Sequence, residues 1–137
     1  MGERLNLIQD PAERRASIED CGYCHLMGMR TLEVNEDEVK VEMDLEGKLN
    51  AVGTGHGGAV FSLADQAFAI ACNRGELTQV ARSASIRYLK PARGRLVATA
   101  RTVSEDERGS VVKVQVHAGD LLVAEFEGIG AKLKERK

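Results

Sequence analysis

The sequence is poor in several residue types that mark particular classes of protein. Its 137 residues include no tryptophan, two tyrosines and three phenylalanines. These are too few aromatic rings for the stacked platforms that bind single-stranded nucleic acid. Lysine and arginine together number 19 and aspartate and glutamate 21, which gives a formal net charge of -2. This balance argues against a nucleic-acid partner, because such proteins carry a basic face.

Long apolar runs and paired cysteines are missing as well. No run of about 18 apolar residues, the length of a transmembrane helix, occurs in the chain. Residues Met1 to Leu5 lack the apolar core of a secretory signal peptide, so we expect a cytoplasmic protein with no membrane partner. Three cysteines, an odd number, do not form a disulfide framework. The length suits a single domain, 1–137, with a substantial core.

The apolar pattern predicts an α+β fold. A short charged surface helix is expected at 11–22, where Asp10 can cap and Pro11 fits the first helical position. The segment 57–74 is apolar on nearly its whole circumference and therefore predicts a buried helix. Strands are expected at 29–34, 38–45, 77–89, 96–103, 111–117 and 121–133, followed by a charged tail, 134–137. Short turns between strands indicate an antiparallel sheet that curls around the single long helix.

A glycine-rich loop precedes the long helix: Gly53-Thr54-Gly55-His56-Gly57-Gly58. Glycines let backbone N–H groups approach a ligand, and a helix directs its positive dipole end at the same point. The loop also matches the dinucleotide-binding fingerprint. That fingerprint requires a buried strand directly before it and a parallel βαβ unit, whereas polar residues 48–50 precede the loop here. We therefore favour an anion-holding loop, in which His56 either holds the turn or contacts the substrate.

Asp65 is the single acidic residue between Glu46 and Glu76, and apolar residues surround it in the sequence. A carboxylate in an apolar helix needs a partner or a function. It could pair with Arg82 or Arg87 on a neighbouring strand, or it could act as a nucleophile or general base with a raised pKa. The glycine loop just upstream favours the catalytic role.

The spacing between the loop and the acid predicts an assembly. Gly57 and Asp65 are eight residues apart, which is about 12 Å along a helix. One carbonyl group cannot contact both. Two antiparallel helices related by a two-fold axis would place Gly57 of one chain opposite Asp65 of the other. The sequence therefore predicts a homodimer with two shared active sites.

The segment Cys21-Gly22-Tyr23-Cys24-His25 matches a haem-attachment signature and a redox Cys-x-x-Cys. Haem attachment would require export and a second axial ligand, and a redox motif would follow a strand. A zinc site would need a second pair of ligands, and none is recognisable. We expect two semi-buried thiols and a loop histidine, with no metal bound.

Two segments carry a family resemblance. The first segment is Asn50…Gly55-His56-Gly57-Gly58…Leu63-Ala64-Asp65, and the second is Ile86-Arg87-Tyr88-Leu89-Lys90-Pro91-Ala92. Together they resemble the hotdog-fold acyl-CoA thioesterases, and most closely the PaaI-type (phenylacetic acid degradation) branch. The resemblance implies a long helix wrapped by a six-stranded antiparallel sheet, paired into dimers and usually tetramers. It also implies hydrolysis of acyl-CoA to a free acid and CoA without a cofactor.

The resemblance assigns roles to individual residues. The Gly57 N–H would polarise the thioester carbonyl, with Asn50 near the carbonyl or the attacking water and His56 supporting the loop. Asp65 of the partner chain would be the base or nucleophile, and a serine on the next strand, Ser83, would orient the water. Fixed N–H donors suit this reaction because negative charge develops on the carbonyl oxygen.

Further residues are candidates for contact with the substrate. Phe61, Leu63 and Phe68 are candidates for the acyl pocket, and Lys90, Arg93 and Arg108 for the CoA phosphates. Gly58 is a candidate for contact with the substrate or CoA. The acyl group stays open between aryl and medium-chain types, and so does direct attack by Asp65 against attack by water. Two other functions are compatible with the pattern. They are a non-catalytic acyl-CoA-binding module and an acyl-thioester hydratase or dehydratase.

Overall fold

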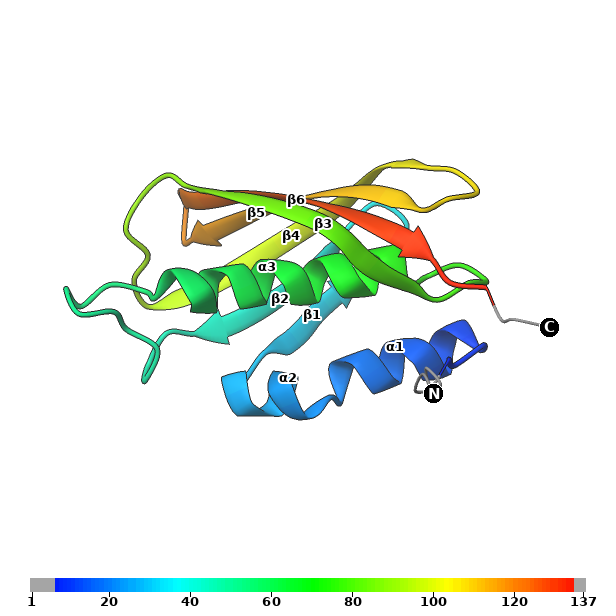
Figure 1. Ribbon diagram of the computed structural model, residues 1–137. Coiled ribbons are helices and arrows are strands. Elements are labelled where there is room, and N and C mark those ends of the chain that lie inside the picture. The colour runs from blue at the N-terminus through cyan, green and yellow to red at the C-terminus, as the bar shows by residue number, and fades with distance from the viewer. Residues whose placement is uncertain (1–6, 135–137) are drawn as a thin grey trace, which may run out of the picture.

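The computed structural model describes residues 7–134, in which one long helix packs against a six-stranded sheet and two shorter helices precede the sheet in the chain (Figure 1). Residues Met1 to Leu5, which lack a signal-peptide pattern, and residues 135–137 of the expected tail lie outside this range. In chain order the elements are α1 (Pro11–Glu19), α2 (Gly22–Met27), β1 (Arg30–Val34), β2 (Val39–Asp44), α3 (Gly57–Cys72), β3 (Gln79–Tyr88), β4 (Arg95–Glu105), β5 (Ser110–Ala118) and β6 (Leu121–Lys132).

The sheet has the strand order β1-β2-β4-β5-β6-β3, and every neighbouring pair is antiparallel. Helix α3 lies against one face of the sheet, and α1 runs beside the C-terminal half of α3 (Figure 1). The expected fold, a long helix against a six-stranded antiparallel sheet, is confirmed. The dinucleotide-binding alternative is excluded, because its βαβ unit requires parallel strands.

The core forms where α3 meets alternate residues of the sheet. Val39, Val41 and Met43 of β2 are at most 1% exposed, as the alternation of that segment predicts. Phe68 of α3 packs so closely on β6 that a Cβ atom at Gly128 would lie 2.5 Å from its ring. Only glycine fits at that position of β6.

The N-terminal helices differ from the prediction. The helix expected at 11–22 ends at Glu19, and the segment expected to be irregular forms α2. The Cys21 thiol caps α2 by accepting a hydrogen bond from the Cys24 N–H at 3.4 Å. Gly28, with a φ of 66°, ends it in the left-handed region. Cysteine is not among the preferred capping residues, which explains why the sequence did not reveal this helix.

The surface character predicted for α1 is wrong at one residue. Arg14 is 3% exposed, and its guanidinium donates to five main-chain carbonyl groups. Two of the acceptors, Ile8 and Gln9, precede α1, and three, Asn73, Gly75 and Glu76, follow α3. Arg14 therefore fastens α1 to the C-terminal end of α3, where a helix dipole favours positive charge. No helix in the described part of the chain has the length and apolarity needed to span a membrane.

Candidate active site

The loop before α3 is held by Asn50. Its side-chain oxygen accepts hydrogen bonds from the N–H groups of Val52 and Thr54 at 3.1 and 3.0 Å. Its amide nitrogen donates to the Thr54 hydroxyl at 2.9 Å and keeps a second hydrogen for another acceptor. A Cβ atom at Gly55 would lie 2.8 Å from the Leu45 side chain, so the loop packs closely on the sheet.

His56 is the N-cap of α3. Its Nδ1 accepts a hydrogen bond from the Gly58 N–H at 2.9 Å, which leaves the ring proton on Nε2. The N–H groups of Ala59 and Val60 donate to the His56 carbonyl oxygen. Of the two roles considered for His56, the structure shows the one in which it holds the turn, and its Nε2 stays free for a ligand.

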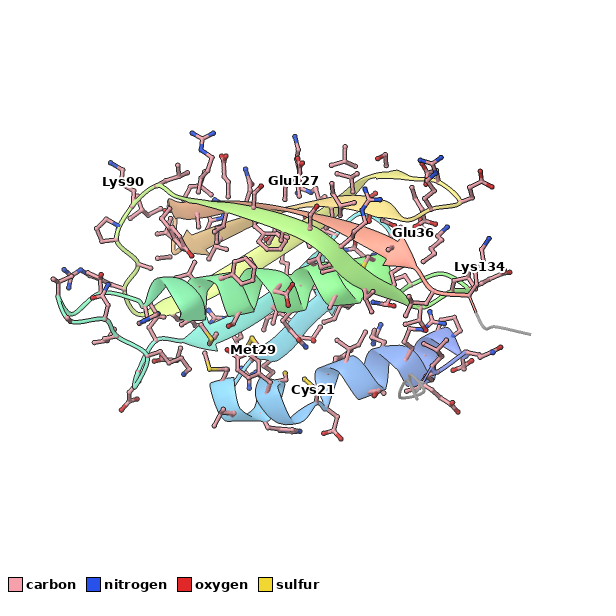
Figure 2. The ribbon with its side chains drawn as sticks, in the orientation of Figure 1. Cys21, Met29, Glu36, Lys90, Glu127 and Lys134 are labelled. Carbon is pink, nitrogen blue, oxygen red and sulfur yellow. The ribbon has the colours of Figure 1, made fainter. Side chains whose placement is uncertain are left out.

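The Gly57 N–H is left without an acceptor among residues 7–134. It is the first N–H of α3 and points out of the end of the helix that carries the positive dipole. The Tyr88 hydroxyl donates to the Gly57 carbonyl oxygen at 3.0 Å and so holds the first residue of the helix through its other main-chain group. A cavity of about 330 Å³ opens here, with Asn50, Gly57, Tyr88 and Lys90 in its wall. Lys90 lies at this end of the molecule (Figure 2).

Asp65 lies two turns further along α3, on a second cavity of about 320 Å³ between α1, α3 and β3. Its carboxylate is half-buried and has neither a hydrogen bond nor an ion pair with any described residue. The suggested pairing with Arg82 or Arg87 is therefore absent within the protomer. Burial raises the pKa of Asp65 above its usual range, because no partner offsets the loss of water around the charge.

The two cavities have no lining residue in common. One holds a free hydrogen-bond donor at the start of α3, and the other holds a desolvated carboxylate near its middle. Within one protomer, the donor at the start of α3 and the Asp65 carboxylate therefore open into different cavities.

The predicted substrate residues fall at different places in the molecule. Phe68 is 2% exposed, lines the Asp65 cavity and packs on Phe126, with 5.9 Å between ring centroids. Phe61 is half-buried, with its ring 5.4 Å from that of Phe126. Leu63 is fully buried in the core, and the N–H of Gly58 is taken by His56.

The basic residues lie at opposite ends of the sheet. Lys90 and Arg93 precede β4, next to the start of α3, whereas Arg108 follows β4. Strand β4 is 11 residues long and separates them. Ser83 lies next to a bulge in β3 and pairs in register with Ile129. Thr78, Gln79, Val80 and Ala81 line the Asp65 cavity instead, so a place for Ser83 in the site stays a prediction.

The cysteine segment has structural contacts. The Cys24 thiol is buried and donates to the Met29 carbonyl oxygen at 3.2 Å, and burial raises its pKa. His25 contacts Asp20 at 2.6 Å on the surface. Figure 2 shows Cys21 at the junction of α1 and α2. In the part of the chain that the structure describes, no three potential metal ligands come together.

Several residues of the two cavities were not predicted as site residues. Tyr88 belongs to a segment of the resemblance, but its contact with the Gly57 carbonyl oxygen depends on the fold. Ser17 and Ile18 line the Asp65 cavity from α1, Thr78 lines it from just before β3, and Gln79 lines it from the start of β3. No sequence signal identifies them, because their positions depend on where α1 docks.

Comparison with known proteins agrees with the fold. Residues 15–124 match the family model described as "Domain of unknown function (DUF4442)". The acyl-coenzyme A thioesterase PaaI of Escherichia coli is 33% identical over 117 residues, which is 82% of this chain and 84% of that protein. A solved structure of the E. coli PaaI protein superposes with a TM-score of 0.81 at 27% identity, over 90% of this chain and 94% of that one.

A mutant of the phenylacetic acid degradation protein PaaI from Thermus thermophilus is also similar. It is 31% identical, with a TM-score of 0.75 over 81% of this chain and 98% of its own. The fold, taken together with these relatives, identifies a hotdog-fold thioester hydrolase. The chain belongs to the PaaI-type family of hotdog-fold thioesterases.

Proposed function

We propose that the protein hydrolyses acyl-CoA thioesters at active sites shared between two copies of the chain. The observation that carries the proposal is the pair of unsatisfied groups on α3. The Gly57 N–H has no acceptor and the Asp65 carboxylate has no donor within residues 7–134. Both residues are partly exposed and each lines a cavity, so a ligand can reach them, and a carboxylate whose pKa is shifted without a partner is a candidate for function.

The Gly57 end supplies the electrophilic half of the reaction. The thioester carbonyl oxygen would accept hydrogen bonds from the Gly57 N–H and from the second amide hydrogen of Asn50. The positive end of the α3 dipole strengthens this site as the oxygen becomes negative. Tyr88 holds the Gly57 carbonyl, and His56 caps the first turn, so the donor is fixed before the substrate arrives.

The Asp65 end supplies the attacking half. A desolvated carboxylate is a stronger base than one in water. In the water route, Asp65 accepts a proton from water, the water oxygen bonds to the carbonyl carbon, and the carbon–sulfur bond breaks. The CoA thiolate leaves with the bonding electrons. In the direct route, a carboxylate oxygen of Asp65 bonds to the carbonyl carbon, and the CoA thiolate leaves with the electrons of the carbon–sulfur bond. Water then cleaves the resulting anhydride and restores the Asp65 carboxylate. Ser83 remains our candidate for orienting the water.

Strand β3 is the proposed dimer surface. It is an edge strand of ten residues, and most of them are exposed. Val80 and Tyr88 on this strand are 46% and 55% exposed. An edge strand with apolar side chains invites pairing with a second copy. Antiparallel pairing of two β3 strands about a two-fold axis would set the two α3 helices antiparallel and place Gly57 of one chain opposite Asp65 of its partner.

The same dimer would gather the basic residues. Lys90 and Arg93 lie at the Gly57 end of a protomer, and Arg108 lies at the opposite end of the sheet. The two-fold axis would bring Arg108 of the second chain toward the first chain's Lys90, where CoA phosphates leave the site. A tetramer formed from two such dimers, and a cytoplasmic location, stay predictions from the sequence.

The alternatives receive less support. A hydratase or dehydratase of this fold uses a histidine paired with an acid, whereas the Nδ1 of His56 is occupied by the Gly58 N–H. A binding module would not need a carboxylate in an apolar cavity, where it destabilises the protein. No described residue neutralises Asp65, which favours catalysis.

Complementation between two inactive variants tests the proposal. Gly57→Pro removes the donor and should preserve the helix, because proline suits the first helical position. His56, with φ -60° and ψ 133°, already has the conformation that precedes a proline. Asp65→Asn removes the base. Each variant alone should lose about 10²–10³ in kcat. Gly57→Ala is the matched control, because it adds a Cβ atom near Tyr88 and keeps the N–H.

The two variants are then co-expressed with different tags and purified as mixed dimers. A mixed dimer has one site with neither defect and one with both, so its kcat should recover to about half of the wild-type value per dimer. If each site lay within one chain, both sites of a mixed dimer would be defective and activity would stay at the level of the parents. That outcome would contradict the shared site.

A further inference from the structure

We infer that helix α1 forms the far wall of the acyl-binding cavity and limits the length of the acyl group that the enzyme accepts. The inference rests on the proposed function, because it takes the substrate's acyl chain to lie in the cavity that contains Asp65. It adds a direction to the bound substrate. The acyl group points toward α1 of the chain that supplies Asp65, and CoA points toward the partner chain.

The lining of the Asp65 cavity carries the inference. Ser17 and Ile18 of α1, and Ile8 just before it, face Phe68 and Ala69 of α3 across the cavity, and Val80 lies on β3. These side chains are mostly apolar, as an acyl chain requires. The cavity beside Gly57 has Asn50 and Lys90 in its wall and suits the polar part of the substrate.

The volume sets the size of the acyl group. The cavity holds about 320 Å³, and a water molecule, which is similar in size to a methylene group, occupies about 30 Å³ in the liquid. The space therefore takes roughly ten non-hydrogen atoms. A medium-length acyl chain or one aromatic ring with its linker fits, whereas a long-chain fatty acyl group would have to displace α1.

Helix α1 is held as a fixed wall. Arg14 ties it to the carbonyl groups after α3 at Gly75 and Glu76, at 2.6 and 2.9 Å. At the other end of the helix, the Gln66 amide of α3 donates to the Ile18 carbonyl oxygen at 3.1 Å. The helix is thus fastened at both ends of the segment that faces the cavity, and a fixed wall gives a sharp limit on acyl length.

Two neighbouring residues of α1 allow a matched test. Ser17 lines the Asp65 cavity, whereas Ala16 faces a different groove, beside Val34 and Arg74. Both are exposed, so a larger side chain at either position should leave the fold intact. Ser17→Phe fills the acyl cavity and Ala16→Phe does not. Ile18→Ala enlarges it.

The measurement is kcat/KM for CoA esters from acetyl to dodecanoyl. Each methylene group in an apolar pocket contributes about tenfold or more to discrimination, so Ser17→Phe should lower the value for octanoyl-CoA at least about tenfold and leave acetyl-CoA within about twofold. Ala16→Phe should keep the wild-type profile, and Ile18→Ala should move the preferred length upward. Equal profiles for Ser17→Phe and Ala16→Phe would overturn the inference.

A second readout separates this inference from the proposed function. Binding of free octanoate by calorimetry needs no turnover and no intact thioester. Loss of octanoate binding in Ser17→Phe, with retention in Ala16→Phe and in Asp65→Asn, would support the α1 wall even if the wild-type protein hydrolysed no acyl-CoA. Octanoate binding that is the same in Ser17→Phe and wild type would refute the wall while leaving hydrolysis untouched.

Discussion

Replacement of Arg14 by methionine, which keeps most of the apolar stem, should loosen α1 from the rest of the molecule. The guanidinium makes three hydrogen bonds to the chain after α3, to Asn73, Gly75 and Glu76, at 3.3, 2.6 and 2.9 Å. A hydrogen bond to a charged group contributes about 1.5–3 kcal/mol, and the longest of the three contributes least. The two shorter bonds alone would therefore contribute about 3–6 kcal/mol if the acceptors stayed buried.

The full loss should not be observed, because α1 can separate and let water reach the carbonyl groups. We expect Arg14→Met to lower the free energy of unfolding by about 2–3 kcal/mol, with the loss limited by the docking energy of α1. Urea denaturation gives this value. Hydrogen exchange should show faster exchange in α1 with little change in α3 and the sheet, because the opening is local.

Arg15→Met is the control, since Arg15 is on the same helix and its side chain is 48% exposed. Its ion pair with Glu19, at 2.8 Å, spans one turn of the helix and is worth about 0.5 kcal/mol or less. If Arg14→Met were no more destabilising than Arg15→Met, the five contacts of Arg14 would not hold α1, and the account of this helix as a fixed wall would be wrong.

Three further predictions follow from single contacts. Asp65→Asn should be more stable than wild type at neutral pH, because burial raises the pKa of Asp65 and so disfavours its charged form. The difference in stability should shrink as the pH falls through that raised pKa and the wild-type carboxyl becomes neutral. Urea midpoints across a pH series would test this. Glu42→Gln should be destabilising at neutral pH, because hydrogen bonds from two arginines lower the pKa of Glu42. The stability difference between variant and wild type should disappear only in more acidic solution, as the wild-type carboxyl is protonated below that lowered pKa. Gly128→Ala should cost about 1–3 kcal/mol by overpacking against Phe68, whereas Gly75→Ala, with open space around its Cβ position, should be close to neutral in the same thermal assay.

The elements with a strong apolar pattern could be predicted from the sequence. The alternation of Val39, Val41 and Met43 follows from one strand face meeting the core, and the all-round apolar character of 57–72 follows from burial of α3. The start of α3 at Gly57 was equally clear, because the glycine loop ends there. In these segments the local pattern and the packed structure require the same residues.

The parts that depend on docking could not be predicted. Arg14 looks like any charged residue of a surface helix, because the three acceptors that tie it to α3 lie about 60 residues away in the chain. The bulge between Ala81 and Ser83 leaves no residue signature, yet it breaks the alternation that decides which side chains of β3 face α3. The consecutive residues Thr78 to Ala81 also line the cavity around Asp65, which alternation alone does not predict.

The separation of Gly57 and Asp65 on one helix has a physical rationale. A carboxylate within the first turn would cap its own helix, as His56 does here, and would accept the N–H groups that a thioester oxygen needs. The same contact would lower the pKa of the acid and make it a poor base. Two turns of separation keep the donor free and the acid basic in each chain. In the proposed dimer the two groups approach each other only with the substrate carbonyl between them, so neither can satisfy the other before the reaction.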